Sequence, residues 1–253
     1  MNNIILHIPH SSLDLPKEFW ENVVCVRSDV DEFNYNITDL YTDELFNSVK
    51  YKSIVAPYSR IYCDIEKFVQ DDKEIMSKFG MGFVYTHTNN GKRFFELNEE
   101  YKQKVYNDYY KKLHSDLDRI VEDSIIKNTT ILLDCHSFCK DIIMFEDKKE
   151  NLPDICIGFD ELYYNEELIL FIKKYFEKYN YKVFFNYPYF GTMIPDKFIQ
   201  NKVDNLYCIM IEINKNLYLD KDYQKNDNFD VLKKQIQDLF KELESIVLIK
   251  KHS

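Results

Sequence analysis

The sequence TILLDCHSFCK, residues 129–139, decides the expected fold because an apolar run ends there in polar side chains. Residues 131–133 have the length and apolar character of a strand that is buried on both faces, as in a largely parallel sheet. Asp134 and His136 follow where such a strand leaves the core. Because chemistry in open α/β sheets collects at the carboxyl ends of strands, this stretch predicts a candidate site. A hydrogen-bonded structural histidine is the alternative explanation of His136.

Strands and helices alternate around this stretch. The strongest helix signal covers residues 98–127, where apolar side chains recur every four residues and Asn98 is a suitable N-cap. We expect one α/β domain over residues 1–253, with a central mixed, mostly parallel sheet and helices on both faces. The expected strands are residues 3–7, 51–56, 61–63, 129–134, 141–145, 155–158, 181–186 and 206–214, and the expected helices are 36–49, 98–127, 165–179 and 227–247.

Composition excludes several classes of partner. The net charge is −10 and no basic stripe is present, which argues against nucleic acid or an anionic membrane as a partner. No apolar segment approaches the roughly 18 residues of a membrane span, and the N-terminus turns polar too early for a signal peptide. The six cysteines are scattered and are expected to be reduced. We therefore expect a cytoplasmic protein.

Three further polar residues stand out in apolar surroundings. His10 follows a strand that must end before Pro9, so it lies at a strand end like His136. Glu212 interrupts the apolar strand at residues 206–214, where a carboxylate is costly unless it is paired or functional. Asp39 lies at the start of the expected helix, where helix capping is the ordinary explanation.

Arginine is rare in this chain, so each arginine needs an explanation. The 33 basic residues include only four arginines, and Arg60 lies beside expected strands. A planar guanidinium suits bidentate recognition of a carboxylate better than an ammonium does. Arg60 is therefore a candidate for binding a substrate carboxylate, and an internal ion pair with Asp64 is the alternative.

The strand-end residues form a possible metal site. Two imidazoles and one carboxylate are a usual ligand set for catalytic zinc, and the strand-end residues offer His10 and His136 with Asp39 or Glu212. A second carboxylate outside the ligand set would transfer protons, and Asp134 could orient a histidine ligand. A serine hydrolase that uses Ser137 or Ser11 is a weaker alternative, because neither serine lies in a G-x-S-x-G turn.

Seven short segments resemble, in the expected order, the motifs of the N-formylglutamate amidohydrolase family. They are PHSS (9–12), TDLYTDELF (38–46), YSRIYCDIEKF (58–68), GMGFVYTHTNNGKRF (80–94), LLDCHSF (132–138), LPDICIG (152–158) and IEINKNLYLD (211–220). The resemblance implies a zinc-exopeptidase-like α/β fold, related to the carboxypeptidase and aspartoacylase architecture. It also implies metal-dependent hydrolysis of the amide of an N-acyl amino acid. The chain departs from the family pattern at Ser12, Lys67 and Lys215, so the resemblance does not fix the substrate.

The resemblance also assigns roles to individual residues. It implies that one zinc ion is bound by His10, His136 and Asp39, the last in preference to Asp43. It implies Glu212 as the general acid/base. It also implies that the substrate carboxylate is bound by Arg60 and Arg93, and that Asn186 lies on the substrate side of the site. The leading hypothesis is thus a zinc-dependent amidohydrolase for a substrate such as N-formyl-glutamate. The alternatives are a metallo-carboxypeptidase or another acyl-amino-acid deacylase on the same scaffold, and a non-catalytic protein that binds small acids.

Overall fold

The computed structural model describes residues 2–143 and 150–246. The chain divides into two units, which are described in turn. Unit 1 comprises Met1–Ile8, Tyr41–Ile54 and Leu117–Ser253, and unit 2 comprises Pro9–Leu40 and Val55–Asp116. This division does not test the expectation of one domain over residues 1–253, which stays a prediction.

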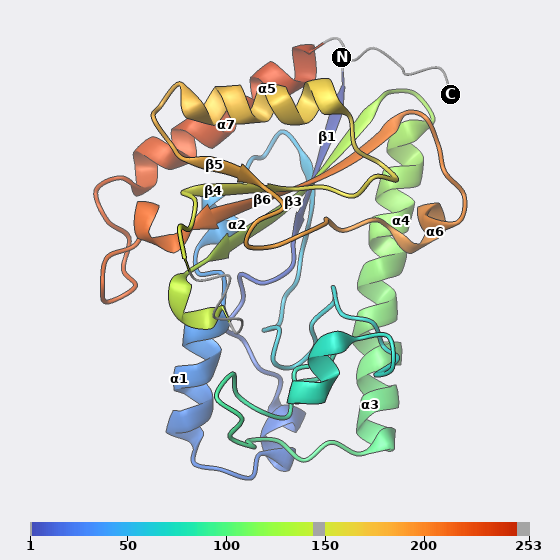
Figure 1. Ribbon diagram of the computed structural model, residues 1–253. Coiled ribbons are helices and arrows are strands. Elements are labelled where there is room, and N and C mark those ends of the chain that lie inside the picture. Colours follow the sequence, from blue (N-terminus) through green and yellow to red (C-terminus); the bar gives the residue numbers. More distant parts are fainter. Residues whose placement is uncertain (1, 144–149, 247–253) are drawn as a thin grey trace. The chain divides into compact units, whose positions relative to one another are not determined.

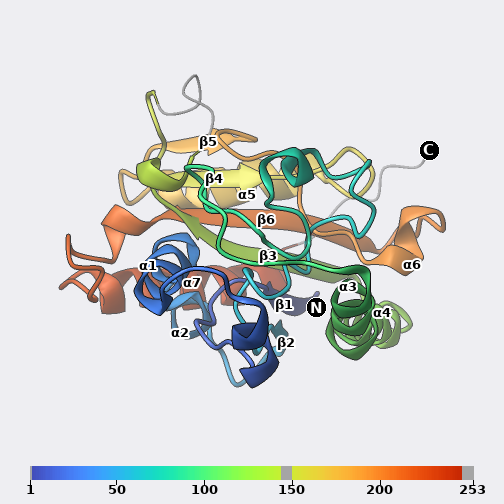
Figure 2. The same ribbon diagram turned by 90° about the horizontal axis from the view of Figure 1, so that it is seen from below.

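Unit 1 is built on a six-stranded sheet with the strand order β2-β1-β3-β6-β4-β5 (Figure 2). The strands are β1 (Asn3–Ile8), β2 (Lys52–Val55), β3 (Thr130–Phe138), β4 (Ile155–Gly158), β5 (Val183–Phe185) and β6 (Leu206–Asn214). The central strands β1, β3 and β6 are parallel, β4 is antiparallel to β6, and β5 is parallel to β4. The predicted α/β fold with a mixed, mostly parallel sheet is confirmed.

Both faces of this sheet are covered. Every residue of β3 is buried, and so is every residue of β6 except Asn214, which is possible only if neither face of the central strands meets solvent. The helices of this part of the chain are α2 (Thr42–Leu45), the end of α4 (Lys111–Ile125), α5 (Glu166–Glu177), α6 (Asp196–Ile199) and α7 (Phe229–Ser245). Helix α7 contacts β1, and α5 contacts β4 and β5.

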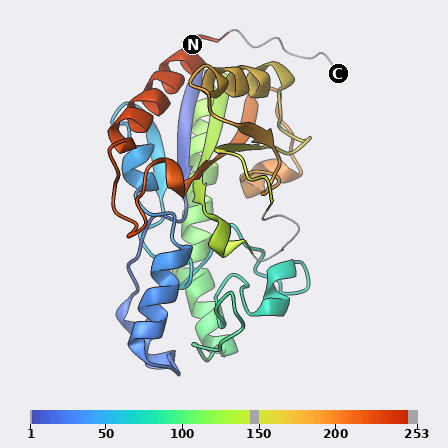
Figure 3. The ribbon, with the colours of Figure 1, turned by 60° about the vertical axis from the view of Figure 1, so that its left-hand side comes forward.

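Helices α5 and α7 lie side by side in Figure 1. The hydroxyl of Tyr175 on α5 donates to the backbone carbonyl of Gln235 on α7. The end of α7 lies beside the start of β1 (Figure 3), and the Asn2 amide donates there to the carbonyls of Leu243 and Ile246. These contacts fix the amino end of β1. The position of His7 along the strand is thereby fixed as well.

The strand register gathers polar side chains near the carboxyl end of the sheet. His7 pairs with Asp134 across β1 and β3, and His136 pairs with Glu212 across β3 and β6. Partners in register point to the same face, as do residues two apart on one strand. These four side chains therefore share one face. The expected end of the strand at residue 134 is wrong, because β3 continues to Phe138 and contains His136.

Unit 2 consists of helices and loops around an aromatic core. Its elements are the short helix η1 (Lys17–Asn22), α1 (Arg27–Ile37), η2 (Ile75–Phe79), α3 (Glu99–Val105), the π-helical turn η3 (Tyr106–Tyr110) and the start of α4. Phe19 stacks on Phe95 with ring centroids 4.9 Å apart, and Phe33 packs on Phe94 at 5.6 Å. The expected N-cap is confirmed, since the Asn98 side chain accepts from the backbone amide of Tyr101 at 2.8 Å.

Three expected elements differ from the structure. The helix expected at 36–49 is wrong: α1 ends at Ile37, where the Thr38 hydroxyl donates back to the Asn34 carbonyl, and Tyr41 then takes a left-handed φ of 62° before α2. The strand expected at 61–63 is a turn. The strand expected at 141–145 is replaced at its start by a short 3-10 helix, Lys140–Ile142, and its end lies outside the described residues.

Two expectations from composition can be compared with the structure. All six cysteines are free, as expected of reduced thiols. Within residues 2–143 and 150–246, no helix has the length and apolar character that crossing a membrane requires.

Candidate functional site

In unit 2, the buried imidazole of His10 lies among three carboxylates. Its Nε2 is 2.9 Å from Asp64 Oδ1 and 3.6 Å from Glu66 Oε2, and its Nδ1 is 3.8 Å from Asp39 Oδ2. The backbone amide of Asp39 also donates to the His10 carbonyl at 2.9 Å, which fixes the two residues to each other. Two of the three predicted ligands, His10 and Asp39, therefore lie together. Asp43 has an exposed side chain on α2.

Asp64 organises this cluster. Its Oδ1 accepts from the backbone amide of Glu66 at 3.2 Å as well as from His10. Its Oδ2 accepts from Arg60 Nη2 and Nε, at 2.8 and 3.2 Å, and from the Tyr85 hydroxyl at 2.8 Å. Burial by itself would raise the pKa of Asp64, but the charge of Arg60 and the interaction with His10 outweigh it and hold that pKa well below its ordinary value. Asp64 is thus an ionised acceptor for donors from four residues.

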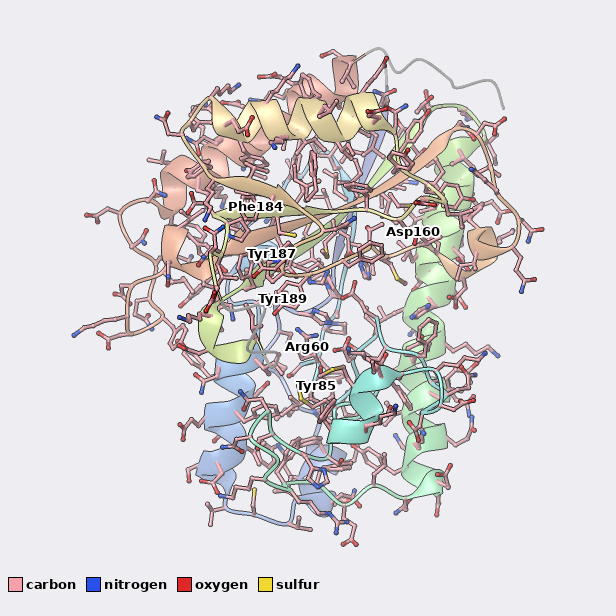
Figure 4. The ribbon with its side chains drawn as sticks, in the orientation of Figure 1. Arg60, Tyr85, Asp160, Phe184, Tyr187 and Tyr189 are labelled. Carbon is pink, nitrogen blue, oxygen red and sulfur yellow. The ribbon has the colours of Figure 1, made fainter. Side chains whose placement is uncertain are left out.

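Arg60 forms the internal ion pair that the sequence left open, and it lies next to Tyr85 (Figure 4). Burial would lower the pKa of Arg60, but Asp64, Tyr85 and Asp39 raise it well above its ordinary value. Among the described residues, Asp64 accepts from the Nε and Nη2 atoms of Arg60 and not from Nη1. The ion pair therefore orients the guanidinium without using all of its donors.

In unit 1, Asp134 accepts hydrogen bonds from histidines, as Asp64 does in unit 2. Its Oδ1 accepts from His7 Nδ1 at 2.8 Å and from His136 Nε2 at 3.0 Å, and its Oδ2 accepts from the backbone amide of Met193 at 2.8 Å. Burial would raise the pKa of Asp134, but the interactions with His136 and His7 hold it well below its ordinary value. Glu212 is buried beside His136 on the neighbouring strand. The predicted support of His136 by Asp134 has the required hydrogen bond.

The loop that follows β5 is attached to the same aspartate through Met193. Asn186, which begins this loop at a φ of 50°, accepts from the amides of Phe159 and Gly191 and donates to the Phe159 carbonyl. Its side chain therefore shapes the loop, and its predicted substrate role stays a prediction. Figure 4 shows how Phe184, Tyr187 and Tyr189 follow one another from β5 into this loop.

Two other predicted residues lie apart from these clusters. Arg93 is exposed on the hairpin whose strands meet at His87 and Arg93, and its guanidinium pairs with Glu96 at 3.5 Å. Its substrate role stays a prediction. Ser137 lies next to His136 in the sequence, hence on the opposite face of β3, and its buried Oγ makes no hydrogen bond within the described part of the chain. This geometry gives no support to a serine nucleophile.

Sequence reasoning missed the roles of His7, Asp64 and Tyr85. No site role was predicted for His7, and Asp64 was considered only as an ion-pair partner of Arg60. The signal for His7 was available, because aligning the apolar runs of residues 3–6 and 130–133 in parallel places His7 opposite Asp134. No comparable signal exists for Asp64, which is 54 positions from His10 and lies in an irregular segment.

The clusters suit a divalent cation. A carboxylate can only accept, so Asp64 places the proton of His10 on Nε2 and leaves the Nδ1 lone pair facing Asp39. Donor atoms on a tetrahedral zinc ion lie roughly 3.4 Å apart, close to the 3.8 Å between His10 Nδ1 and Asp39 Oδ2. The bond from His136 Nε2 to Asp134 likewise orients the His136 ring through one of its two nitrogens. Histidines held by carboxylates in this way are typical of metal sites.

An α/β sheet with buried histidine–carboxylate clusters near the ends of its parallel strands places this chain among the α/β enzymes. The chain belongs to the N-formylglutamate amidohydrolase family, whose sequence profile matches residues 2–219. It is therefore classed as an amidohydrolase. No match was found among curated proteins.

Two solved structures are similar in fold. The N-formylglutamate amidohydrolase of Ralstonia eutropha JMP134 superposes with a TM-score of 0.81 at 20% identity, over 96% of this chain and 92% of that chain. A gene product of Agrobacterium tumefaciens gives a TM-score of 0.65 at 17% identity, over 96% of this chain and 90% of that chain. At these identities the likeness supports the fold, and the family assignment depends on the profile match.

Proposed function

We propose that this chain is a zinc-dependent amidohydrolase that cleaves the amide of a small N-acyl amino acid such as N-formyl-glutamate. The observation that carries the proposal is the arrangement of His10, whose Nε2 is held by Asp64 while its Nδ1 faces Asp39. Membership of the amidohydrolase family supplies the reaction class. We further propose a cytoplasmic location and a carboxypeptidase-like scaffold, in line with the composition and the fold.

His10, Asp39 and His136 are the proposed ligands of a single zinc ion. Bound zinc with such ligands polarises a carbonyl group and allows water to act as a nucleophile near neutral pH. Asp64 and Asp134 fix the ring orientation of the two histidines, and both carboxylates are themselves held by further hydrogen bonds. This arrangement supports rigid placement of the ligand atoms.

Glu212 is the proposed general acid/base. Its carboxylate would accept the proton that water loses on attack and deliver it to the nitrogen of the leaving amine. Its place beside His136 in the β3–β6 register supports this role, as does the cost of burying a carboxylate that serves no purpose. The proposed role also accounts for an acidic residue in an otherwise apolar strand.

Arg60 is the proposed anchor for the substrate carboxylate. Its contact with Asp64 orients the guanidinium before substrate arrives, which reduces the entropy lost on binding. Arg93 and Asn186 are proposed as secondary substrate contacts.

Metal analysis tests the ligand assignment directly. We expect one zinc per chain in the wild type and little zinc in H10A and H136A, with folding checked by circular dichroism. H87A is the matched control, because the half-buried His87 is not a proposed ligand and its side chain bonds only to Thr86 Oγ1 among the described residues. Stoichiometric zinc in either of the first two variants would exclude that histidine as a ligand.

A substrate panel tests the reaction. N-formyl-glutamate, N-acetyl amino acids and short peptides with a free carboxyl terminus separate the proposed activity from deacylase and carboxypeptidase activities. We expect the highest kcat/KM for a small acyl group on an acidic amino acid. Thermal stabilisation by such compounds without turnover would instead indicate a binding protein.

A further inference from the structure

We infer that Asp64 and Tyr85 are positioning residues for His10: Tyr85 fixes the carboxylate of Asp64, and Asp64 holds the Nε2–H of His10 so that Nδ1 is the ligand atom. The inference rests on the proposed function, because it describes how a proposed metal ligand is oriented. It assigns a role to Tyr85, which contacts the cluster from a distant part of the chain.

The geometry defines the tautomer of His10. Its Nε2 is 2.9 Å from Asp64 Oδ1, a normal hydrogen-bond distance, whereas its Nδ1 is 3.8 Å from Asp39 Oδ2, which is too long for a hydrogen bond. The strong contact therefore carries the proton on Nε2. In the neutral ring, the Nδ1 lone pair then points towards a carboxylate oxygen, which is the arrangement of two ligand atoms on one cation.

Asp64 is held from its other oxygen. The Tyr85 hydroxyl donates to Oδ2 at 2.8 Å, beside the two bonds from Arg60. The ring of Tyr85 is buried and packs against Phe33, with centroids 6.5 Å apart. Burial also raises the pKa of Tyr85 well above its ordinary value, so the phenol remains a donor. A rigid donor on Oδ2 restricts rotation of the carboxylate and so keeps Oδ1 on His10.

Titration of the metal-free protein with zinc chloride, followed by calorimetry, tests this chain of contacts. Changes to the partners of a ligand typically weaken metal binding by 10–100-fold. We expect about a tenfold loss of zinc affinity in Y85F, which removes one hydroxyl and keeps the ring, and a loss of up to about 100-fold in D64N. A zinc affinity within threefold of wild type in both variants would overturn the inference.

Y109F is the matched control. Tyr109 is buried in the same unit, and its hydroxyl bonds to the backbone of Tyr58 and not to Asp64. A purely structural effect of losing a buried hydroxyl would lower the unfolding temperature of Y109F and Y85F alike and leave zinc affinity unchanged. Equal losses of zinc affinity in the two variants would therefore also contradict the role of Tyr85.

Nitrogen-15 NMR of labelled histidine reads the tautomer without any activity assay. We expect His10 to carry its proton on Nε2 in the metal-free wild type and to keep it there with zinc bound. A proton on Nδ1 would overturn the inference. If no substrate is hydrolysed but the tautomer and zinc affinity behave as expected, the proposed activity fails and the positioning role stands. If hydrolysis occurs while Y85F and D64N bind zinc normally, the positioning role fails alone.

Discussion

Glu212 is the residue whose replacement separates proton transfer from metal binding. E212Q keeps the shape of the side chain but cannot accept a proton, so we expect kcat to fall by about 10²–10⁴-fold with KM little changed. Zinc content should stay at the wild-type level, because Glu212 is not a proposed ligand. Steady-state kinetics on N-formyl-glutamate with metal analysis of the same preparation measures both. More than a tenth of wild-type kcat in E212Q would remove Glu212 from the reaction.

Individual site residues could be predicted where a polar side chain stands in, or directly after, an apolar run. Glu212 stands in an apolar strand, and His10 and His136 follow apolar runs, so burial cost alone marks them. The structure places His10 with Asp39 and His136 with Asp134, although their roles remain predictions. Asp64 violates no local rule, since an acid four residues after an arginine is explained by an ion pair. Its contact with His10 depends on tertiary structure.

The loop after β5 contacts Asp134 through the backbone amide of Met193. A substitution at Gly158 tests whether this contact matters. A Cβ at residue 158 would lie 2.2 Å from the backbone oxygen of Gly191, so G158A must displace the loop. We expect a loss of stability of about 1–3 kcal/mol and a lower kcat/KM, because the Met193 amide is drawn away from Asp134. Urea unfolding and kinetics measure the two effects.

G91A provides the comparison. Gly91 has a φ of 83° at the turn of the hairpin, and a Cβ there meets nothing within 4 Å. Its replacement should cost about 1–2 kcal/mol through backbone conformation alone and leave kcat/KM unchanged. Full activity in G158A would show that the loop contact does not matter for catalysis.

Elements were predictable where the apolar pattern is long and its cap is unambiguous. Helix α3 begins after the expected cap Asn98, and β6 matches the expected residues 206–214. Helix α1 was missed because the expected helix began at residue 36, whereas the Thr38 hydroxyl bonds back to the turn that precedes it and marks the end of a helix. A hydroxyl residue between two apolar stretches can end one helix or begin another, and only the backbone on each side decides which.

At the scale of the whole molecule, alternation of strands and helices predicted the fold class but not the complete sheet. The antiparallel pairing of β4 with β6 leaves no mark in the sequence, because both strands are buried and lack polar alternation. The division into two units also leaves no mark in the sequence. Both units combine segments that are distant in the chain, and no glycine-rich or proline-rich linker marks where they change.

The proposed zinc ligands are distant in the sequence, so the unfolded chain should not hold the ion and zinc should stabilise the folded protein. A ligand at 100 times its Kd adds about 2.7 kcal/mol to the free energy of unfolding, which corresponds to a rise in Tm of roughly 5–10 °C for a chain of this size. We expect this rise with zinc in the wild type, its reversal by a chelator, and its loss in D39A. D43A should keep the full rise, because the exposed Asp43 side chain is not a proposed ligand. Scanning calorimetry with and without zinc measures the shift.

A shift that survives in D39A and disappears in D43A would identify Asp43 as the carboxylate ligand. A shift that survives in both variants would exclude a carboxylate ligand from this segment.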